Sequence, residues 1–203
     1  ARRLFPSGAV LRRFFVPENA TQQNTIMPLT QIPLSELSKP LRRTYDRARE
    51  AMEKKNYPYA TEMLRNLLLK APGCMEARET LRRVQLERIK GKPTFLLRLQ
   101  AYPAVIFGAY VKGPMLLKKG ETAKALDTAE KLMTLDPTFL PSILFLARAA
   151  EEGGLHDLAL RTLQHGIQYY DDNIELLQRQ LDIYRSLEDE QNALRILQEM
   201  CKL

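Results

Sequence analysis

Few side chains in this 203-residue sequence have the types and spacing that catalysis requires. The two histidines, His156 and His165, share no helical face, and neither has a carboxylate partner at a suitable spacing. The two cysteines, Cys74 and Cys201, match neither a disulfide framework nor a zinc-ligand pattern. A Gly-rich phosphate loop, a serine nucleophile elbow and a His-Glu-x-x-His motif are all missing from the sequence. We therefore predict a protein that is not an enzyme and that has no catalytic residues, no cofactor and no metal site.

The elements that could position binding side chains follow a period of 34 residues. A small residue returns at Ala125, Ala159 and Ala193, and an apolar residue four positions later keeps the same period. The turn glycines Gly120 and Gly154 are also 34 residues apart. This period is typical of helix-turn-helix pairs that stack by pressing one helix against the small residues of the next. The sequence therefore predicts an all-α fold.

Prolines support the same frame, since Pro72, Pro103 and Pro137 each lie three residues before the start of a unit. The pattern resembles the tetratricopeptide repeat (TPR), a 34-residue helix pair that ends in proline. The resemblance implies a right-handed solenoid over residues 41–203, preceded by an extended basic arm and linker over residues 1–40. The predicted repeats are 41–74, 75–105, 106–139, 140–173 and 174–203, with starts at Leu41, Met75, Ile106, Leu140 and Ile174.

The second predicted repeat is irregular. It has 31 residues, and Gly91-Lys92-Pro93 separates a regular helix from a short return segment over Thr94–Tyr102. In the third repeat, Gly113-Pro114 is expected to kink the first helix or to delay its start. We therefore expect residues 91–114 to be the irregular centre of the array.

The first helices of successive TPR units line a concave groove, so the resemblance implies that binding residues lie on these helices. Arginine beside tyrosine suits an acidic peptide, because guanidinium groups pair with carboxylates and aromatic rings stack on apolar neighbours. In the second repeat this frame also places Glu79 toward the groove. The candidate partner-binding residues are Arg42, Tyr45, Arg49, Arg83, Phe107, Tyr110 and Arg148.

Charge is unevenly distributed along the chain. Residues 1–124 carry 24 basic and ten acidic side chains, a net charge of +14, whereas residues 125–203 carry seven and 14, a net charge of −7. Residues 1–17 are Arg-rich and acid-free, which is typical either of an organelle targeting segment or of an arm that lies on a partner. The expected arm contacts are Arg2, Arg3, Arg12, Arg13, Phe14 and Phe15.

The most apolar part of the chain is Thr94–Val111, which contains a single charge, Arg98. Because Pro103 and this arginine interrupt it, we do not expect it to be an integral membrane span. Two interpretations stay open: buried repeat core, or an exposed surface for a partner helix or a membrane interface.

These patterns favour a noncatalytic scaffold or adaptor that binds a protein partner, for example through an acidic peptide segment, in the groove of the array. One alternative is an adaptor whose basic half docks on a polyanion such as RNA, the ribosome or an anionic membrane surface. Another is a structural helical subunit of a larger membrane-associated complex. The composition favours the cytoplasm and leaves a mitochondrial, other organellar or peripheral membrane location open, and the oligomeric state is not predicted.

Overall fold

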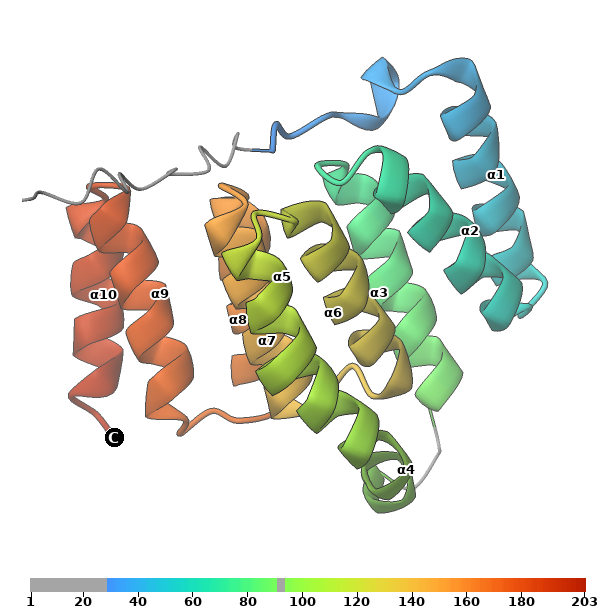
Figure 1. The fold of residues 1–203 in the computed structure, drawn as a ribbon. Helices are drawn as coiled ribbons and strands as arrows, with labels where there is room; N and C mark the ends of the chain where they lie inside the picture. Colours follow the sequence, from blue (N-terminus) through green and yellow to red (C-terminus); the bar gives the residue numbers. More distant parts are fainter. Residues whose placement is uncertain (1–28, 91–93) are drawn as a thin grey trace, which may run out of the picture.

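The computed structural model describes residues 29–90 and 94–203, in which the regular structure is entirely helical and no strand is present (Figure 1). Neighbouring helices pack consecutively, as expected for a helical repeat. The predicted arm residues, from Arg2 to Phe15, lie outside the described residues. The helices are α1 (Lys39–Glu53), α2 (Tyr57–Lys70), α3 (Met75–Ile89), α4 (Thr94–Ile106), α5 (Gly113–Lys118), α6 (Thr122–Leu135), α7 (Leu140–Glu152), α8 (His156–Ile167), α9 (Ile174–Ser186) and α10 (Glu190–Met200), with a 3-10 turn η1 (Leu34–Glu36) and a π-helical turn η2 (Phe107–Lys112).

The 34-residue period is found in the second half, where α6, α8 and α10 begin at Thr122, His156 and Glu190. Helices α3, α7 and α9 begin at the predicted repeat starts Met75, Leu140 and Ile174, whereas α1 begins two residues before Leu41 and no helix begins at Ile106. The small residues of the period are buried: Ala125 and Ala159 are fully inaccessible to solvent, and the equivalent residue of α10 is nearly so. Small side chains at these positions let helix backbones approach closely, which is how stacked pairs bury a shared core.

The turns within the helix pairs also repeat. Gly120 and Gly154 have φ angles of 72° and 75°, in the left-handed region that glycine adopts without steric cost. In the last pair this position is taken by Glu188, with a φ angle of 57°. The next helix is then capped by Asp189, whose carboxylate accepts a hydrogen bond from the backbone N–H of Asn192. The repeating turn therefore survives the loss of its glycine.

The centre of the array differs from the predicted arrangement. The segment Thr94–Tyr102 is not a return helix for α3, because it forms the first part of α4, which contains Pro103 and runs on through η2 into α5. Gly113-Pro114 causes no break, since the wider π-helical turn directly before it leads into the proline at the start of α5. The result is one helical path over residues 94–118. No return helix follows α3 to complete a helix pair with it.

Two main hydrophobic clusters lie on either side of this irregularity. One joins Leu37 to Val84 and is formed by α1, α2 and α3, and the other joins Ala101 to Ile183 across α4 to α9. A smaller cluster around Leu177 packs α9 against α10. No helix within residues 29–90 and 94–203 is both long and apolar enough to cross a membrane.

An extended segment at residues 29–33, which we call the strap, ties the two halves together. The backbone N–H of Leu29 donates to the carbonyl of Gly153 at 2.8 Å, and that of Ile32 donates to the carbonyl of Gly73 at 3.1 Å. The side chain of Gln31 adds a hydrogen bond to Asp157 at 3.0 Å. Figure 1 shows this part of the chain passing the helix ends before it reaches α1.

The substitution Gly73→Ala is expected to detach the strap. A Cβ at this position would lie 1.9 Å from the carbonyl oxygen of Thr30, so one of the two backbones must move. We expect a loss of about 1–3 kcal/mol in the free energy of unfolding and faster hydrogen exchange at the amides of Leu29 and Ile32. As a control, Gly166→Ala should leave exchange at these two amides unchanged, and unchanged exchange in Gly73→Ala would contradict the prediction.

Candidate functional site

The structure places the predicted partner-binding residues on α1, α3, η2 and α7, and one of them, Tyr45, is buried. Tyr45 is only 8% exposed and its hydroxyl shares a 3.0 Å hydrogen bond with Thr80, so it joins α1 to α3 inside the core. Arg42 is exposed on α1 and its guanidinium donates to the carbonyl of Ser35. Arg49 is also exposed on α1, as is Arg83 on α3.

Three predicted residues lie in the second half of the molecule. Phe107 and Tyr110 are both exposed on η2, within the same helical turn. Arg148 is exposed on α7 and pairs with Glu152, one helical turn away, at 2.9 Å. Pairs of this kind on a helix surface are worth only about 0.3–0.5 kcal/mol, so Arg148 stays free to exchange partners.

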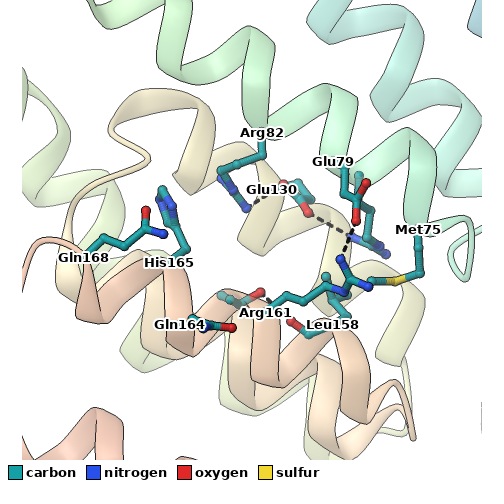
Figure 2. Close-up of a pocket in the computed structure, with 11 residues that line it drawn as sticks. Met75, Glu79, Arg82, Glu130, Leu158, Arg161, Gln164, His165 and Gln168 are labelled. Carbon is teal, nitrogen blue, oxygen red and sulfur yellow. Dashed lines mark hydrogen bonds and ion pairs between the residues drawn. The ribbon is translucent and has the colours of Figure 1, made fainter.

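A groove lies between α3 and α8, with α6 as its floor (Figure 2). Its cavity volume is about 270 Å³. None of the seven predicted binding residues lines it, although Glu79, which the repeat frame placed toward a groove, does. The groove residues used below are Arg78, Glu79, Arg82, Glu130, Arg161 and His165.

The groove continues toward the strap. A second hollow of about 480 Å³ shares Met75, Glu79 and Arg161 with the first and is bounded by strap residues Gln31, Ile32 and Pro33. The extended backbone of the strap therefore lies at one end of a channel whose walls are α3 and α8. An extended peptide could lie between the same two helices, farther along the channel from the strap.

Arg161 and Glu79 close the channel at the point where the two hollows meet. Their side chains form an ion pair at 2.6 Å and are 63% and 52% exposed. An exposed pair of this kind contributes about 0–1 kcal/mol, because water screens both charges. A ligand carboxylate could replace Glu79 as the partner of Arg161 at little cost.

Arg82 provides a second cation in the groove. Its guanidinium donates to Gln85 Oε1 at 2.5 Å and lies 3.7 Å from Glu130 Oε2, beyond hydrogen-bond distance. Burial lowers the pKa of Arg82, and the charge of Glu130 opposes this effect. Arg82 is thus a cation that is only partly neutralised by the groove itself.

His165 also lines the groove and is buried. Its Nε2 is 2.9 Å from the carbonyl oxygen of Pro137, which can only accept, so Nε2 carries the proton. Burial lowers the pKa of His165, and the nearby charge of Arg82 lowers it further. The imidazole is therefore neutral near pH 7 and adds no charge to the groove.

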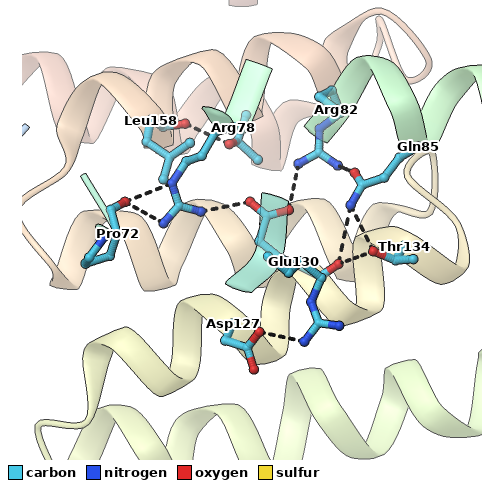
Figure 3. Close-up of polar contacts among 10 residues, drawn as sticks. Pro72, Arg78, Arg82, Gln85, Asp127, Glu130, Thr134 and Leu158 are labelled. Carbon is cyan, nitrogen blue, oxygen red and sulfur yellow. Dashed lines mark hydrogen bonds and ion pairs between the residues drawn. The ribbon is translucent and has the colours of Figure 1, made fainter. Parts of the chain in front are cut away.

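The groove floor belongs to a buried polar seam between α3 and α6 (Figure 3). Arg78 Nη1 donates to Glu130 Oε1 at 2.8 Å, and the two side chains are only 4% and 3% exposed. The same guanidinium donates twice to the carbonyl of Pro72, and Gln85 reaches Thr134 at 3.0 Å. Polar contacts rather than apolar packing thus join the two hydrophobic clusters at this point.

An ion pair beside the seam extends it to α2. Arg65 Nη2 lies 2.7 Å from Asp127, which also receives Lys131 at 2.7 Å. Burial alone would raise the pKa of Asp127. Hydrogen bonds and charge interactions with Lys131 and Arg65 outweigh this effect, so the pKa is lowered. Within the described ranges, no group of three or more His, Cys, Asp or Glu side chains is placed to hold a metal ion.

A second candidate site is an apolar face on the helical path over residues 94–118. Seven large apolar side chains on this path are 50–73% exposed, at spacings of three to five residues or side by side. The apolar stretch that the sequence singled out is therefore buried on one side only, along Ala101, Val105 and Ala109. We call the exposed face the apolar stripe; its residues are Phe95, Leu99, Tyr102, Phe107, Tyr110, Val111 and Met115.

Comparison of the sequence with models of known protein families gives no match, and comparison with curated proteins gives none either. The fold and the two sites therefore define the protein only as an all-helical chain of consecutively packed helices, with a charged groove and an exposed apolar face.

Proposed function

We propose that this chain is a noncatalytic scaffold of the TPR type, a right-handed solenoid that binds an acidic, extended segment of a protein partner in the groove between α3 and α8. The 34-residue spacing of the starts of α6, α8 and α10, and of α7 and α9, supports the TPR assignment. The observation that carries the binding function is the open groove, in which Arg161 is held only by an exposed ion pair to Glu79.

The charges of the groove favour an acidic ligand. In the first hollow, Arg78, Arg82 and Arg161 face Glu79 and Glu130, and neutral His165 leaves one positive charge in excess. The second hollow adds the carboxylates of Glu76 and Asp157, so an acidic side chain suits the first hollow and not the strap end. A ligand carboxylate near Arg161 on the α8 wall would form a charge-assisted bond, and the second cation, Arg82, lies on the opposite wall, α3. Because the strap already runs in an extended form at the end of this channel, a peptide in extended conformation suits its shape.

Binding of acidic peptides to the full chain tests this function. We expect fluorescence polarisation to show that Asp/Glu-rich peptides bind and that Arg161→Glu weakens them about 10- to 100-fold, because one charge-assisted bond is replaced by repulsion. Glu79→Gln should strengthen binding by freeing Arg161 from its ion pair.

A matched control is Arg179→Glu. Like Arg161, Arg179 is a partly exposed arginine that pairs with a glutamate; it lies on α9, outside the groove. This variant should bind the peptides as the unmodified chain does. The proposal fails if both arginine variants weaken binding equally, or if peptides with Asn and Gln in place of Asp and Glu bind as tightly.

A further inference from the structure

The apolar stripe exposes more large apolar surface than a helix packed against a repeat core requires. Phe95 is 73% exposed, and Leu99, Phe107 and Tyr110 are each at least 60% exposed. Contiguous apolar patches on a protein surface mark sites that are covered by a partner or by lipid. The stripe is continuous because α4, η2 and α5 form a single helical path, whose inner side packs against α6 and α7.

The one charge within the apolar stretch does not interrupt the stripe. Arg98 donates to the hydroxyl of Tyr170 at 2.9 Å, lies 3.6 Å from Asp136 and sits over the ring of Phe139 at 5.8 Å. These contacts hold the guanidinium against the segment that follows α6 and the segment that follows α8. The exposed face of α4 carries the apolar side chains of the stripe together with Gln100.

The sequence around the stripe has charges of one sign. Between Glu87 and Glu121 there is no acidic residue, whereas seven residues are basic. Of these, Lys112, Lys118 and Lys119 are exposed on η2 and at the end of α5, next to the stripe. An anionic surface would therefore meet attraction along this helical path and no repulsion from within it.

We propose that the apolar stripe lies on an anionic lipid surface, with the helical path over residues 94–118 in the plane of the interface. A helix with an apolar, aromatic face and flanking lysines is the pattern of interfacial helices. The hydroxyls of Tyr102 and Tyr110 suit the headgroup level, where amphipathic rings are enriched. Lysines near anionic headgroups add about 1 kcal/mol each to binding.

A lipid surface fits the stripe better than a protein partner does. Protein interfaces of stable complexes carry about one hydrogen bond per 100–200 Å² and have a polar rim. The seven stripe side chains offer only the hydroxyls of two tyrosines as polar groups, and the charged residues beside them in the sequence are all basic. None of the stripe residues lines the groove between α3 and α8, so the two sites use different side chains.

The chain contains no tryptophan, so a single one introduced into the stripe reports on this contact alone. We expect the emission of Phe107→Trp to shift to shorter wavelength, and to become protected from acrylamide, on addition of vesicles of phosphatidylcholine and phosphatidylglycerol in a ratio of about seven to three. Tyr59→Trp, at an exposed position on α2, should show neither change. Equal changes in both variants, or none in Phe107→Trp, would overturn the proposal.

Vesicle flotation measures the strength of the contact. We expect Phe107→Ser/Tyr110→Ser to lower the partition coefficient about tenfold or more, whereas Tyr59→Ser/Leu194→Ser, which removes exposed apolar side chains elsewhere, should leave it nearly unchanged. Binding should also weaken with salt and in Lys112→Glu/Lys118→Glu. Equally tight binding to pure phosphatidylcholine would refute an anionic surface, and a dimer in solution that only the stripe variant dissociates would assign the stripe to a second copy instead.

Discussion

Replacement of Arg78 by methionine is expected to lower the free energy of unfolding by about 3–5 kcal/mol. The guanidinium is 4% exposed and holds Glu130 at 2.8 Å, so Arg78→Met leaves a carboxylate that is 3% exposed without its main partner. The nearest other cation, Arg82, lies 3.7 Å from the second oxygen and is itself engaged with Gln85. The carbonyl of Pro72 also loses both of its hydrogen bonds from the arginine.

A second substitution separates the cost of leaving Glu130 unpaired from the net contribution of the ion pair to the free energy of unfolding. Arg78→Met/Glu130→Leu removes both charges and fills a similar volume, so we expect it to recover most of the lost stability. Urea unfolding followed by circular dichroism gives the free energies for the full cycle.

Arg161→Met is the matched control, because it breaks an ion pair of similar length whose side chains are exposed and should cost no more than about 1 kcal/mol. If Arg78→Met cost as little as this control, or if the double variant were as unstable as the single one, the buried ion pair would not be what holds α3 to α6.

This seam is the part of the fold that the sequence could not predict. Arg78 and Glu130 are 52 positions apart, and neither stands out in a chain with 31 basic and 24 acidic residues. The repeat frame predicts which helices follow one another, but it assumes that each first helix has a return helix. Because α3 has none, it packs mainly against α2, and its polar side chains reach across to α6, which no local pattern indicates.

What the sequence predicts well is governed by local chemistry. Gly120 and Gly154 take the left-handed conformation that their turn needs, and Ala125 and Ala159 are buried where helices meet. Pro103 shows the limit of such reasoning, since it was expected to separate two repeats and instead lies within α4. The helix tolerates it because tertiary packing can outweigh the cost of one lost backbone hydrogen bond.

The candidate site was predicted only in part. The frame assigned the groove to first helices, so it found Glu79 on α3 and missed Arg161, which lies on α8, the second helix of its pair. Tyr45 was expected to face a ligand but packs against Thr80, since an error of one position rotates a side chain by about 100° around a helix. The sequence could not show which side of residues 94–118 is exposed, because apolar residues lie on both faces of this helical path.

Removal of the Phe145 ring should be as costly as loss of Arg78, and it should change the cost of a second substitution. Phe145 is 4% exposed in the core of the second half, so Phe145→Ala is expected to lower the free energy of unfolding by about 3–5 kcal/mol. Its ring also lies against the chain at the end of η2. A Cβ on Gly113 would lie 2.2 Å from two ring carbons.

Gly113→Ala alone should therefore cost about 1–3 kcal/mol through overpacking, although its αR backbone angles suit alanine. Combined with Phe145→Ala, it should cost at least about 1 kcal/mol less, because the ring that it strikes is gone. A contact of 2.9 Å with the carbonyl oxygen of Gly108 would remain, so the cost should not disappear.

Urea unfolding of the four chains in this cycle measures the coupling between the two positions. Gly73→Ala, which acts on the strap and has no contact with Phe145, should be additive with Phe145→Ala and serves as the control. Additive costs for Gly113→Ala and Phe145→Ala would mean that the ring can move aside. The helical path that carries the apolar stripe would then be held by contacts other than Phe145, with Arg98 and its partners the next to be tested.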